Sequence, residues 1–131
     1  MQADPPVNLP DVLAEVRAVV ALYEAALTGN DIAAMDALFW DAPQVVRFGV
    51  GENLYGHPAI AAFRRARQTG PFTRTILRHE VTSWGRDCAV SQIEYRRPGQ
   101  DRPGRETKML IRMADGWRIV SAHVSLLGET V

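Results

Sequence analysis

The sequence predicts an α+β fold in which three N-terminal helices pack on a strongly curved antiparallel sheet. Helical spacing of apolar residues is confined to the first half of the 131-residue chain, and four long β-branched or aromatic stretches fill the second half. Turn residues such as Asp115-Gly116 separate these stretches. Because helices and strands segregated along the chain pack face to face, we expect a helical lid over the sheet and a conical pocket between them.

Composition narrows the class of protein. The chain has 15 Lys plus Arg and 15 Asp plus Glu, which argues against a partner held by bulk charge, such as nucleic acid or anionic lipid. The single Cys88 excludes an internal disulfide and a multi-cysteine zinc site. No apolar run approaches the roughly 18 residues of a membrane span, and the first residues are acidic and Pro-rich. We therefore expect a cytoplasmic protein with no membrane and no nucleic-acid partner.

The chain divides into a flexible arm at residues 1–10 and one domain at 11–131. The first helix of that domain has the clearest pattern, and Gly29 ends it. Asn30 and Asp31 can cap a second helix that Pro43 closes off, so the two helices should form a hairpin. The apolar positions of the first helix are Val12, Val16, Val19, Val20, Tyr23 and Leu27, and those of the second are Ile32, Met35, Leu38 and Phe39.

The remaining elements are mostly strands. Residues 44–50 are short, β-branched and aromatic, which predicts a strand, and residues 53–56 predict a turn or short strand. His57-Pro58 then predicts the start of a third helix that ends before Gly70. The four long strands are predicted at 72–84, 87–96, 106–113 and 117–127.

Several familiar site types are missing from the sequence. It contains no Gly-rich phosphate loop, no Gly-x-Ser-x-Gly elbow and no His-Glu-x-x-His pair. The histidines His57, His79 and His123 are scattered, so their spacing specifies no metal site. We therefore expect neither a metal nor an organic cofactor.

Two polar residues occupy positions where the pattern favours apolar ones. Tyr23 lies on the apolar stripe of the first helix, so its ring is expected in the core and its hydroxyl needs a partner. Arg47 lies within a short apolar strand, where an inward guanidinium would need an anion or a carbonyl. Each also has an ordinary interpretation, as a hydrogen-bonded core tyrosine and as a solvent-facing arginine on an edge strand. The sequence alone does not decide between the functional and the ordinary interpretation of either residue.

Four further residues complete the candidate site, as substrate-binding groups. Arg64 and Arg67 share a helical face with apolar residues, and Arg67 is expected to be the more inward; both could instead snorkel at the core edge. Glu52 could pair with one of these arginines, act as a base at the pocket mouth, or be an ordinary loop acid. His123 is expected on the pocket face of the last strand, or as a structural histidine.

Strict alternation along that last strand also predicts its two faces. One face would carry the candidate pocket residue His123, and the other would be an outer apolar surface that a second copy of the chain covers. We therefore expect a homodimer. The inner set is Trp117, Ile119, Ser121, His123 and Ser125, and the outer set is Val120, Ala122, Val124 and Leu126.

Six segments occur in a characteristic order along the chain: LYEAAL at 22–27, LFW at 38–40, VRFG at 46–49, ENLYG at 52–56, AFR at 62–64 and GWRIVSAHVS at 116–125. They resemble the SnoaL-like branch of the nuclear transport factor 2 superfamily, and within it the AtzH-like and HpxZ-like proteins. The resemblance covers about residues 10–127, and one departure is Glu106-Thr107-Lys108, where Gln or Ser would be expected.

The resemblance implies a cone-shaped fold, a homodimer and a pocket between helices and sheet. It further implies amidohydrolysis of a small carbamoylurea or related ureido compound in cyanuric acid or oxalurate catabolism, with Tyr23 and Arg47 as the catalytic residues. The absence of a nucleophile triad leaves an alternative open, in which the dimer only binds a ligand and assists a neighbouring amidase.

Overall fold

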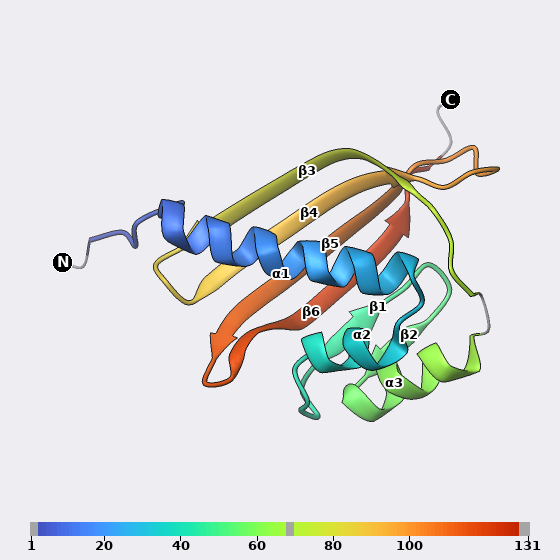
Figure 1. The fold of residues 1–131 in the computed structure, drawn as a ribbon, viewed down its shortest axis with the longest axis horizontal. Helices are drawn as coiled ribbons and strands as arrows, with labels where there is room; N and C mark the ends of the chain where they lie inside the picture. The colour runs from blue at the N-terminus through green and yellow to red at the C-terminus, as the bar shows by residue number, and fades with distance from the viewer. Residues whose placement is uncertain (1–2, 68–69, 129–131) are drawn as a thin grey trace.

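The computed structural model describes residues 3–67 and 70–128 and has the predicted order of elements (Figure 1). Two helices come first and the long strands last, which confirms the α+β class. The elements are α1 (Pro10–Thr28), α2 (Ile32–Leu38), β1 (Val46–Phe48), β2 (Asn53–Tyr55), α3 (His57–Ala66), β3 (Thr75–Trp84), β4 (Cys88–Arg96), β5 (Gly104–Met113) and β6 (Gly116–Leu126).

The six strands form one curved sheet in the order β2-β1-β6-β5-β4-β3. Every neighbouring pair is antiparallel except β1 and β6, which run parallel with Arg47 opposite Ala122. The four long strands form the predicted antiparallel sheet, and β1 joins it through this one parallel pair. Parallel pairing is possible here because the long chain segment between β1 and β6 returns to the same sheet.

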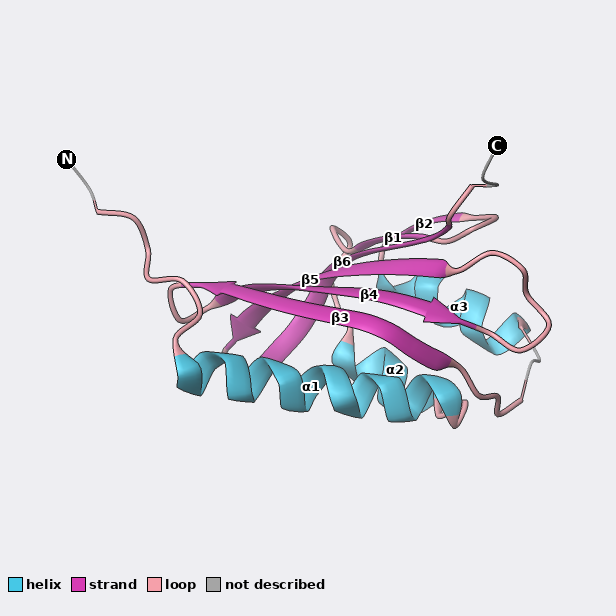
Figure 2. Ribbon diagram, turned by 90° about the horizontal axis from the view of Figure 1, so that it is seen from above, coloured by secondary structure: helices cyan, strands magenta, loops and turns pink. Residues whose placement is uncertain are grey.

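The helices cover one face of this sheet, with α1 running along it (Figure 2). α1 buries Val12, Val16, Val20 and Tyr23 at helical spacing and ends at Gly29, as predicted. α2 is capped by Asp31, whose side chain accepts a hydrogen bond from the Ala34 amide at 3.1 Å.

The segment before α1 is held against the β3–β4 hairpin. The Asn8 amide donates to the Ser83 carbonyl at 3.0 Å, and the Asn8 side chain accepts from the Ser83 amide at 2.9 Å. The Gly85 amide also donates to the Pro6 carbonyl at 2.8 Å. Residues 6–8 are therefore tied to the sheet, whereas a flexible arm was expected for 1–10, of which residues 1–2 lie outside the described part.

A β-bulge in β6 changes which residues face the helices. Met109 pairs with Ser121 while Leu110 pairs with Ile119, so Val120 is the extra residue. Alternation restarts after the bulge. Ile119 is buried on the helix side before it, and Ala122 is buried on that side after it. The predicted faces of the last strand are therefore correct up to Ile119 and wrong beyond it.

Candidate functional site

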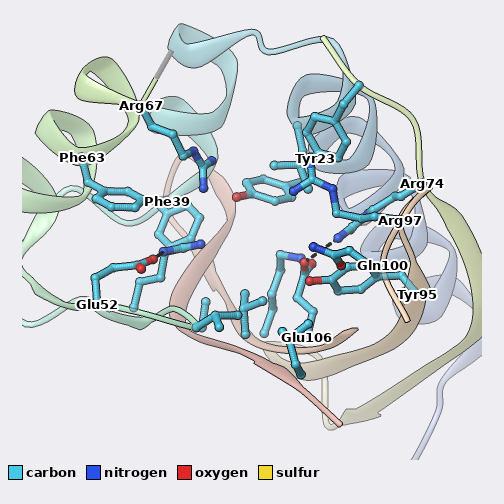
Figure 3. Close-up of a pocket in the computed structure, with 18 residues that line it drawn as sticks. Tyr23, Phe39, Glu52, Phe63, Arg67, Arg74, Tyr95, Arg97, Gln100 and Glu106 are labelled. Atoms are coloured by element: carbon cyan, nitrogen blue, oxygen red, sulfur yellow. Dashed lines mark hydrogen bonds and ion pairs between the residues drawn. The ribbon is translucent and has the colours of Figure 1, made fainter. Parts of the chain in front are cut away.

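A cavity of about 330 Å³ lies between the helices and the sheet (Figure 3). Tyr23 projects into its middle, with Arg67 and Glu52 towards one end and Arg97 towards the other. Apolar residues such as Phe39 supply the rest of the wall. The predicted pair Tyr23 and Arg47 therefore line one cavity, although they come from α1 and β1.

Tyr23 is fixed by contacts around its ring and at its oxygen. Its ring packs at a tilt on Phe39, with centroids 5.8 Å apart. Its hydroxyl oxygen accepts a hydrogen bond from Arg64 Nη2 at 3.3 Å. Only 5% of Tyr23 is exposed, and its hydroxyl is the one polar group that this side chain brings to the cavity.

Arg47 and Glu52 form an ion pair across the loop that joins β1 and β2. Arg47 Nη1 donates to Glu52 Oε1 at 2.8 Å, and both side chains are largely buried. Gly49 makes room for this pair, because a Cβ there would collide with the Glu52 carboxylate and come within 3.0 Å of Arg47. The expectation that Glu52 pairs with an arginine is met by Arg47, whereas Arg64 or Arg67 was the expected partner.

Arg67 follows the last turn of α3 and lines the cavity beside Arg47. Its guanidinium lies over the Phe63 ring, 5.2 Å from the centroid. Burial and the neighbouring charge of Arg47 lower the pKa of Arg67 below its ordinary value. Within residues 3–67 and 70–128, no carboxylate forms an ion pair with it. The Arg67 guanidinium therefore favours the binding of an anionic ligand in the cavity.

Arg64 does not line the cavity, contrary to the expectation that it binds substrate. It is more buried than Arg67, with 4% of the residue exposed, so the predicted order of the two is wrong. Its Nη1 donates to Asp36 Oδ1 at 2.8 Å, and its guanidinium lies over Phe39, 4.5 Å from the ring centroid. Arg64 therefore contacts the Tyr23 hydroxyl without lining the cavity.

His123 lies on the other side of the sheet, which corrects the prediction that it faces the pocket. The bulge at Val120 shifts the alternation by one residue, so His123 is exposed and Ala122 lines the cavity in its place. The His123 ring packs edge-on against Phe48, with centroids 5.6 Å apart.

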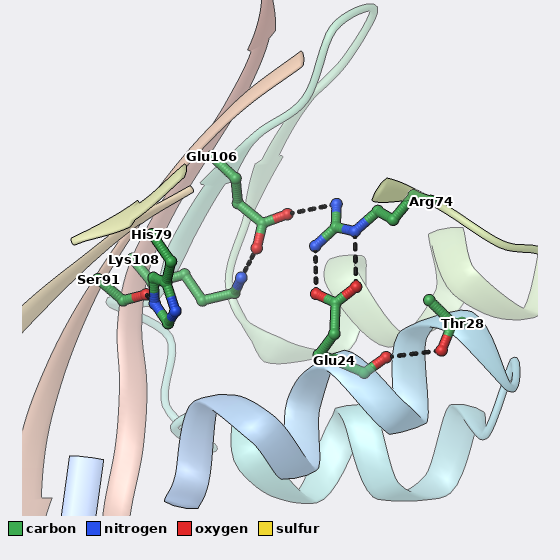
Figure 4. A network of polar contacts seen from close by, with 7 residues as sticks. All are labelled: Glu24, Thr28, Arg74, His79, Ser91, Glu106 and Lys108. Atoms are coloured by element: carbon green, nitrogen blue, oxygen red, sulfur yellow. Dashed lines mark hydrogen bonds and ion pairs between the residues drawn. The ribbon is translucent and has the colours of Figure 1, made fainter. Parts of the chain in front are cut away.

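A buried ionic network that the sequence patterns did not predict lies at the far side of the cavity (Figure 4). Arg74 donates from Nε to Glu24 Oε2 at 2.8 Å and from Nη1 to Glu106 Oε2 at 3.1 Å. The Lys108 amine forms an ion pair with the other oxygen of Glu106. Only 2% of Lys108 is exposed. Two cations and two carboxylates therefore balance one another here.

The network shifts the pKa values of Lys108 and Glu24. Burial lowers the pKa of Lys108 well below its ordinary value, with the nearby charge of Arg74 acting in the same direction. Burial acts to raise the pKa of Glu24, but the hydrogen bond and charge of Arg74 outweigh it, so that pKa is lowered. The Lys108 shift reflects a site that largely excludes water, and the Glu24 shift reflects its contact with Arg74.

A signal for part of this network was present in the sequence. Glu106 and Lys108 alternate along β5 with exposed residues, and they share the buried face with Gly104 and Leu110. Charged residues on the apolar face of a strand indicate a paired site. Arg74 carries no comparable signal, because it lies in a loop before β3.

Among the residues that the structure describes, the cavity wall contains more cationic side chains than carboxylates. The five cationic side chains are Arg47, Arg67, Arg74, Arg97 and Lys108, and the two carboxylates are Glu52 and Glu106. Among the described residues, no group of three or more His, Cys, Asp or Glu could hold a metal ion. No described helix is long and apolar enough to cross a membrane.

The sequence matches the AtzH-like family over residues 5–130. This match spans all three helices and all six strands. The chain belongs to the AtzH-like family. No functionally curated protein matched it in sequence.

Solved structures agree with this assignment. A DUF3225-family protein of unknown function from Pectobacterium atrosepticum is 46% identical, with a TM-score of 0.92 over 96% of this chain and 100% of that chain. A cystatin-like fold protein from Burkholderia xenovorans is 41% identical, with a TM-score of 0.91 over 96% and 99%. An NTF2-like protein of unknown function from Pseudomonas putida is 20% identical, with a TM-score of 0.75 over 89% and 87%, and shows the fold alone. This AtzH-like chain thus has the nuclear transport factor 2-like fold.

Proposed function

We propose that this AtzH-like protein is an amidohydrolase that acts on a small anionic ureido compound. The observation that carries the proposal is the position of Tyr23, whose hydroxyl enters a cavity in which cations outnumber carboxylates. A planar ligand with a carboxylate suits this cavity, because a guanidinium fork binds two oxygens in one plane.

Each polar group would have a separate role. Arg67, which lacks a carboxylate partner among the described residues, would bind the substrate's carboxylate. Arg47, already oriented by Glu52, would polarise the carbonyl whose C–N bond breaks. Water would add to that carbonyl carbon while Tyr23 passes a proton to the departing nitrogen. The proton released by the water would restore the Tyr23 hydroxyl, leaving ammonia and a carboxylate or carbamate.

A second candidate is a binding protein that assists a separate amidase. The cavity wall favours it in one respect, since its described residues include no Ser, Thr, Cys or His to act as a nucleophile. In that case the same arginines would hold the ligand without turnover.

A measurement of ammonia release distinguishes the amidohydrolase from the binding protein. Biuret and oxalurate are both planar carbamoyl compounds, but only oxalurate carries a carboxylate. We expect ammonia from the anionic compound well above the buffer rate and little from the neutral one. Saturable binding of oxalurate without ammonia would instead support the accessory role, and neither binding nor turnover would contradict both.

A second copy of the chain is the proposed partner. The reason first given from the sequence is wrong, because Ala122 and Val124 line the cavity. The outer face of the sheet instead carries Thr107, Ser121 and the apolar Met109, which is 39% exposed. A solution mass near twice 14.5 kDa at micromolar concentration is expected, and Met109→Arg should reduce it. A monomeric wild-type protein would overturn this proposal.

A further inference from the structure

The contact between Arg64 and Tyr23 determines where the phenol proton can point. A guanidinium only donates hydrogen bonds, so at the 3.3 Å contact Arg64 Nη2 is the donor and the Tyr23 oxygen the acceptor. The hydroxyl has one proton of its own, which must then be directed away from Arg64. The Tyr23 oxygen lies at the cavity (Figure 3), which Arg64 does not line.

The guanidinium that makes this contact is itself held rigidly. Asp36, in α2, accepts from Nη1 at 2.8 Å, and the Phe39 ring lies 4.5 Å from the guanidinium carbon. The same Phe39 ring packs against Tyr23. Three helices therefore meet at this point, with Tyr23 from α1, Asp36 from α2 and Arg64 from α3.

We propose that Arg64 is a positioning residue, which directs the Tyr23 proton into the cavity and stabilises negative charge on the phenol oxygen once that proton is donated. The inference rests on the proposed function of Tyr23 as a proton donor. It replaces the substrate contact first expected of Arg64, which does not line the cavity.

A buried arginine could also serve folding alone, and the kinetic pattern distinguishes the two roles. Because Arg64 acts through Tyr23 and does not reach the ligand, its loss should lower kcat and leave KM nearly unchanged. A group that binds the ligand in both the ground state and the transition state would instead change KM.

The neighbouring Arg65 provides a matched control. It has the same side chain on the same helix and lies 3.8 Å from the same Asp36 carboxylate, but 63% of its side chain is exposed. We expect Arg64→Met to reduce kcat for oxalurate roughly ten- to hundredfold, the usual range for losing a charged hydrogen-bond donor. Arg65→Met should change neither kcat nor KM by more than about twofold.

A spectroscopic measurement makes the test independent of turnover. The ¹³Cζ resonance of Tyr23, assigned by its loss in Tyr23→Phe, should move in Arg64→Met and stay in place in Arg65→Met. If Arg64→Met fails to fold, as judged by circular dichroism, Asp36→Asn takes its place, because it frees Nη1 and loosens the same contact. A folded variant with wild-type kcat, a change in KM alone, or an unmoved ¹³Cζ resonance would each overturn the positioning role.

The inference and the proposed function can fail separately. If the wild-type protein releases no ammonia but the Tyr23 resonance still moves in Arg64→Met alone, the hydrolase assignment fails and the directed hydroxyl stands. If ammonia is released and Arg64→Met leaves both kcat and the resonance unchanged, the function stands and the positioning role fails.

Discussion

The Lys108 amine lies 4.5 Å from the centroid of the Tyr23 ring, on a strand that the chain reaches long after α1. Tyr23 is thus in contact with two buried cations, Lys108 at its ring face and Arg64 at its oxygen. An ammonium over an aromatic face is attracted by the ring quadrupole, and the attraction strengthens when water is excluded. The Tyr23 side chain is therefore held by cationic groups on two sides, one at its ring and one at its oxygen.

Tyr23→Phe should abolish turnover while keeping the protein folded and able to bind ligand. The substitution retains the ring that packs on Phe39 and removes only the hydroxyl. We expect a loss of about 1 kcal/mol in the free energy of unfolding, measured by urea denaturation. Oxalurate affinity, measured by calorimetry, should stay within severalfold of wild type. Undiminished ammonia release would show that Tyr23 is only a core tyrosine.

Gly49→Ala should disrupt the Arg47–Glu52 pair and weaken ligand binding. The added methyl group would occupy the space of the Glu52 carboxylate, so the carboxylate must leave Arg47. Gly51→Ala is the control, because a Cβ at that position meets nothing within 4 Å. We expect oxalurate affinity to fall severalfold or more in the first variant alone. Equal affinities in the two variants would mean that the ion pair does not orient Arg47 for the ligand.

Removing Glu106 should destabilise the protein more than removing Lys108. Glu106→Leu leaves the Lys108 ammonium unpaired in the interior, whereas Lys108→Met leaves Glu106 still bound to Arg74 at 3.1 Å. Stranding a buried charge typically costs about 3–5 kcal/mol, so we expect that range for Glu106→Leu and a smaller loss for Lys108→Met. Chemical denaturation at neutral pH measures both, and the reverse order would show that Arg74 does not satisfy Glu106 by itself.

Stability should fall as the pH drops below about 6.5 because of His79. Burial, followed by the charges of Arg17 and Lys108, lowers the pKa of His79 from 6.5. The unfolded chain then binds a proton more readily than the folded one, so the contribution is complete above the unfolded value and is lost as the pH falls through the folded one. The lowered pKa of Glu24 gives a stabilisation that is complete above its ordinary value of 4.5 and is lost only below it, so Glu24 leaves this window clear.

Substitution isolates the contribution of His79. His79→Gln keeps a group able to hydrogen-bond Ser91, which His79 contacts at 2.9 Å, and removes the titration. Melting temperatures between about pH 5 and 7.5 should then vary less than in wild type. His123→Gln, at an exposed position, should keep the wild-type dependence. An unchanged pH profile in His79→Gln would assign the effect to another group.

Periodicity predicted the helices and strands well because their apolar faces are regular. The stripe of α1 and the alternation of β5 both correspond to buried faces in the structure. The bulge at Val120 could not be predicted in the same way, since one extra residue leaves no mark in composition yet reverses every later side chain. His123 was misplaced for that reason alone.

The candidate site was predictable where a polar residue interrupts an apolar pattern. Tyr23 and Arg47 are such residues, and both line the cavity. Arg74 could not be found in this way, because the strand predicted at 72–84 begins only at Thr75 and the loop before it gives Arg74 no regular face. Only the folded chain brings Arg74 between Glu24 and Glu106. Pairing between distant segments is a tertiary property that no local pattern contains.

The parallel pairing of β1 with β6 has a consequence for the order in which the molecule is assembled. Arg47 lies opposite Ala122, so the strand that carries this arginine gains its main partner from the last strand of the sheet. During synthesis from the N-terminus, α1 and Tyr23 emerge early, but β1 has only the short β2 to pair with until β6 leaves the ribosome. The cavity is therefore among the last features to form, and a nascent or truncated chain that ends before β6 carries every candidate catalytic side chain without a binding site.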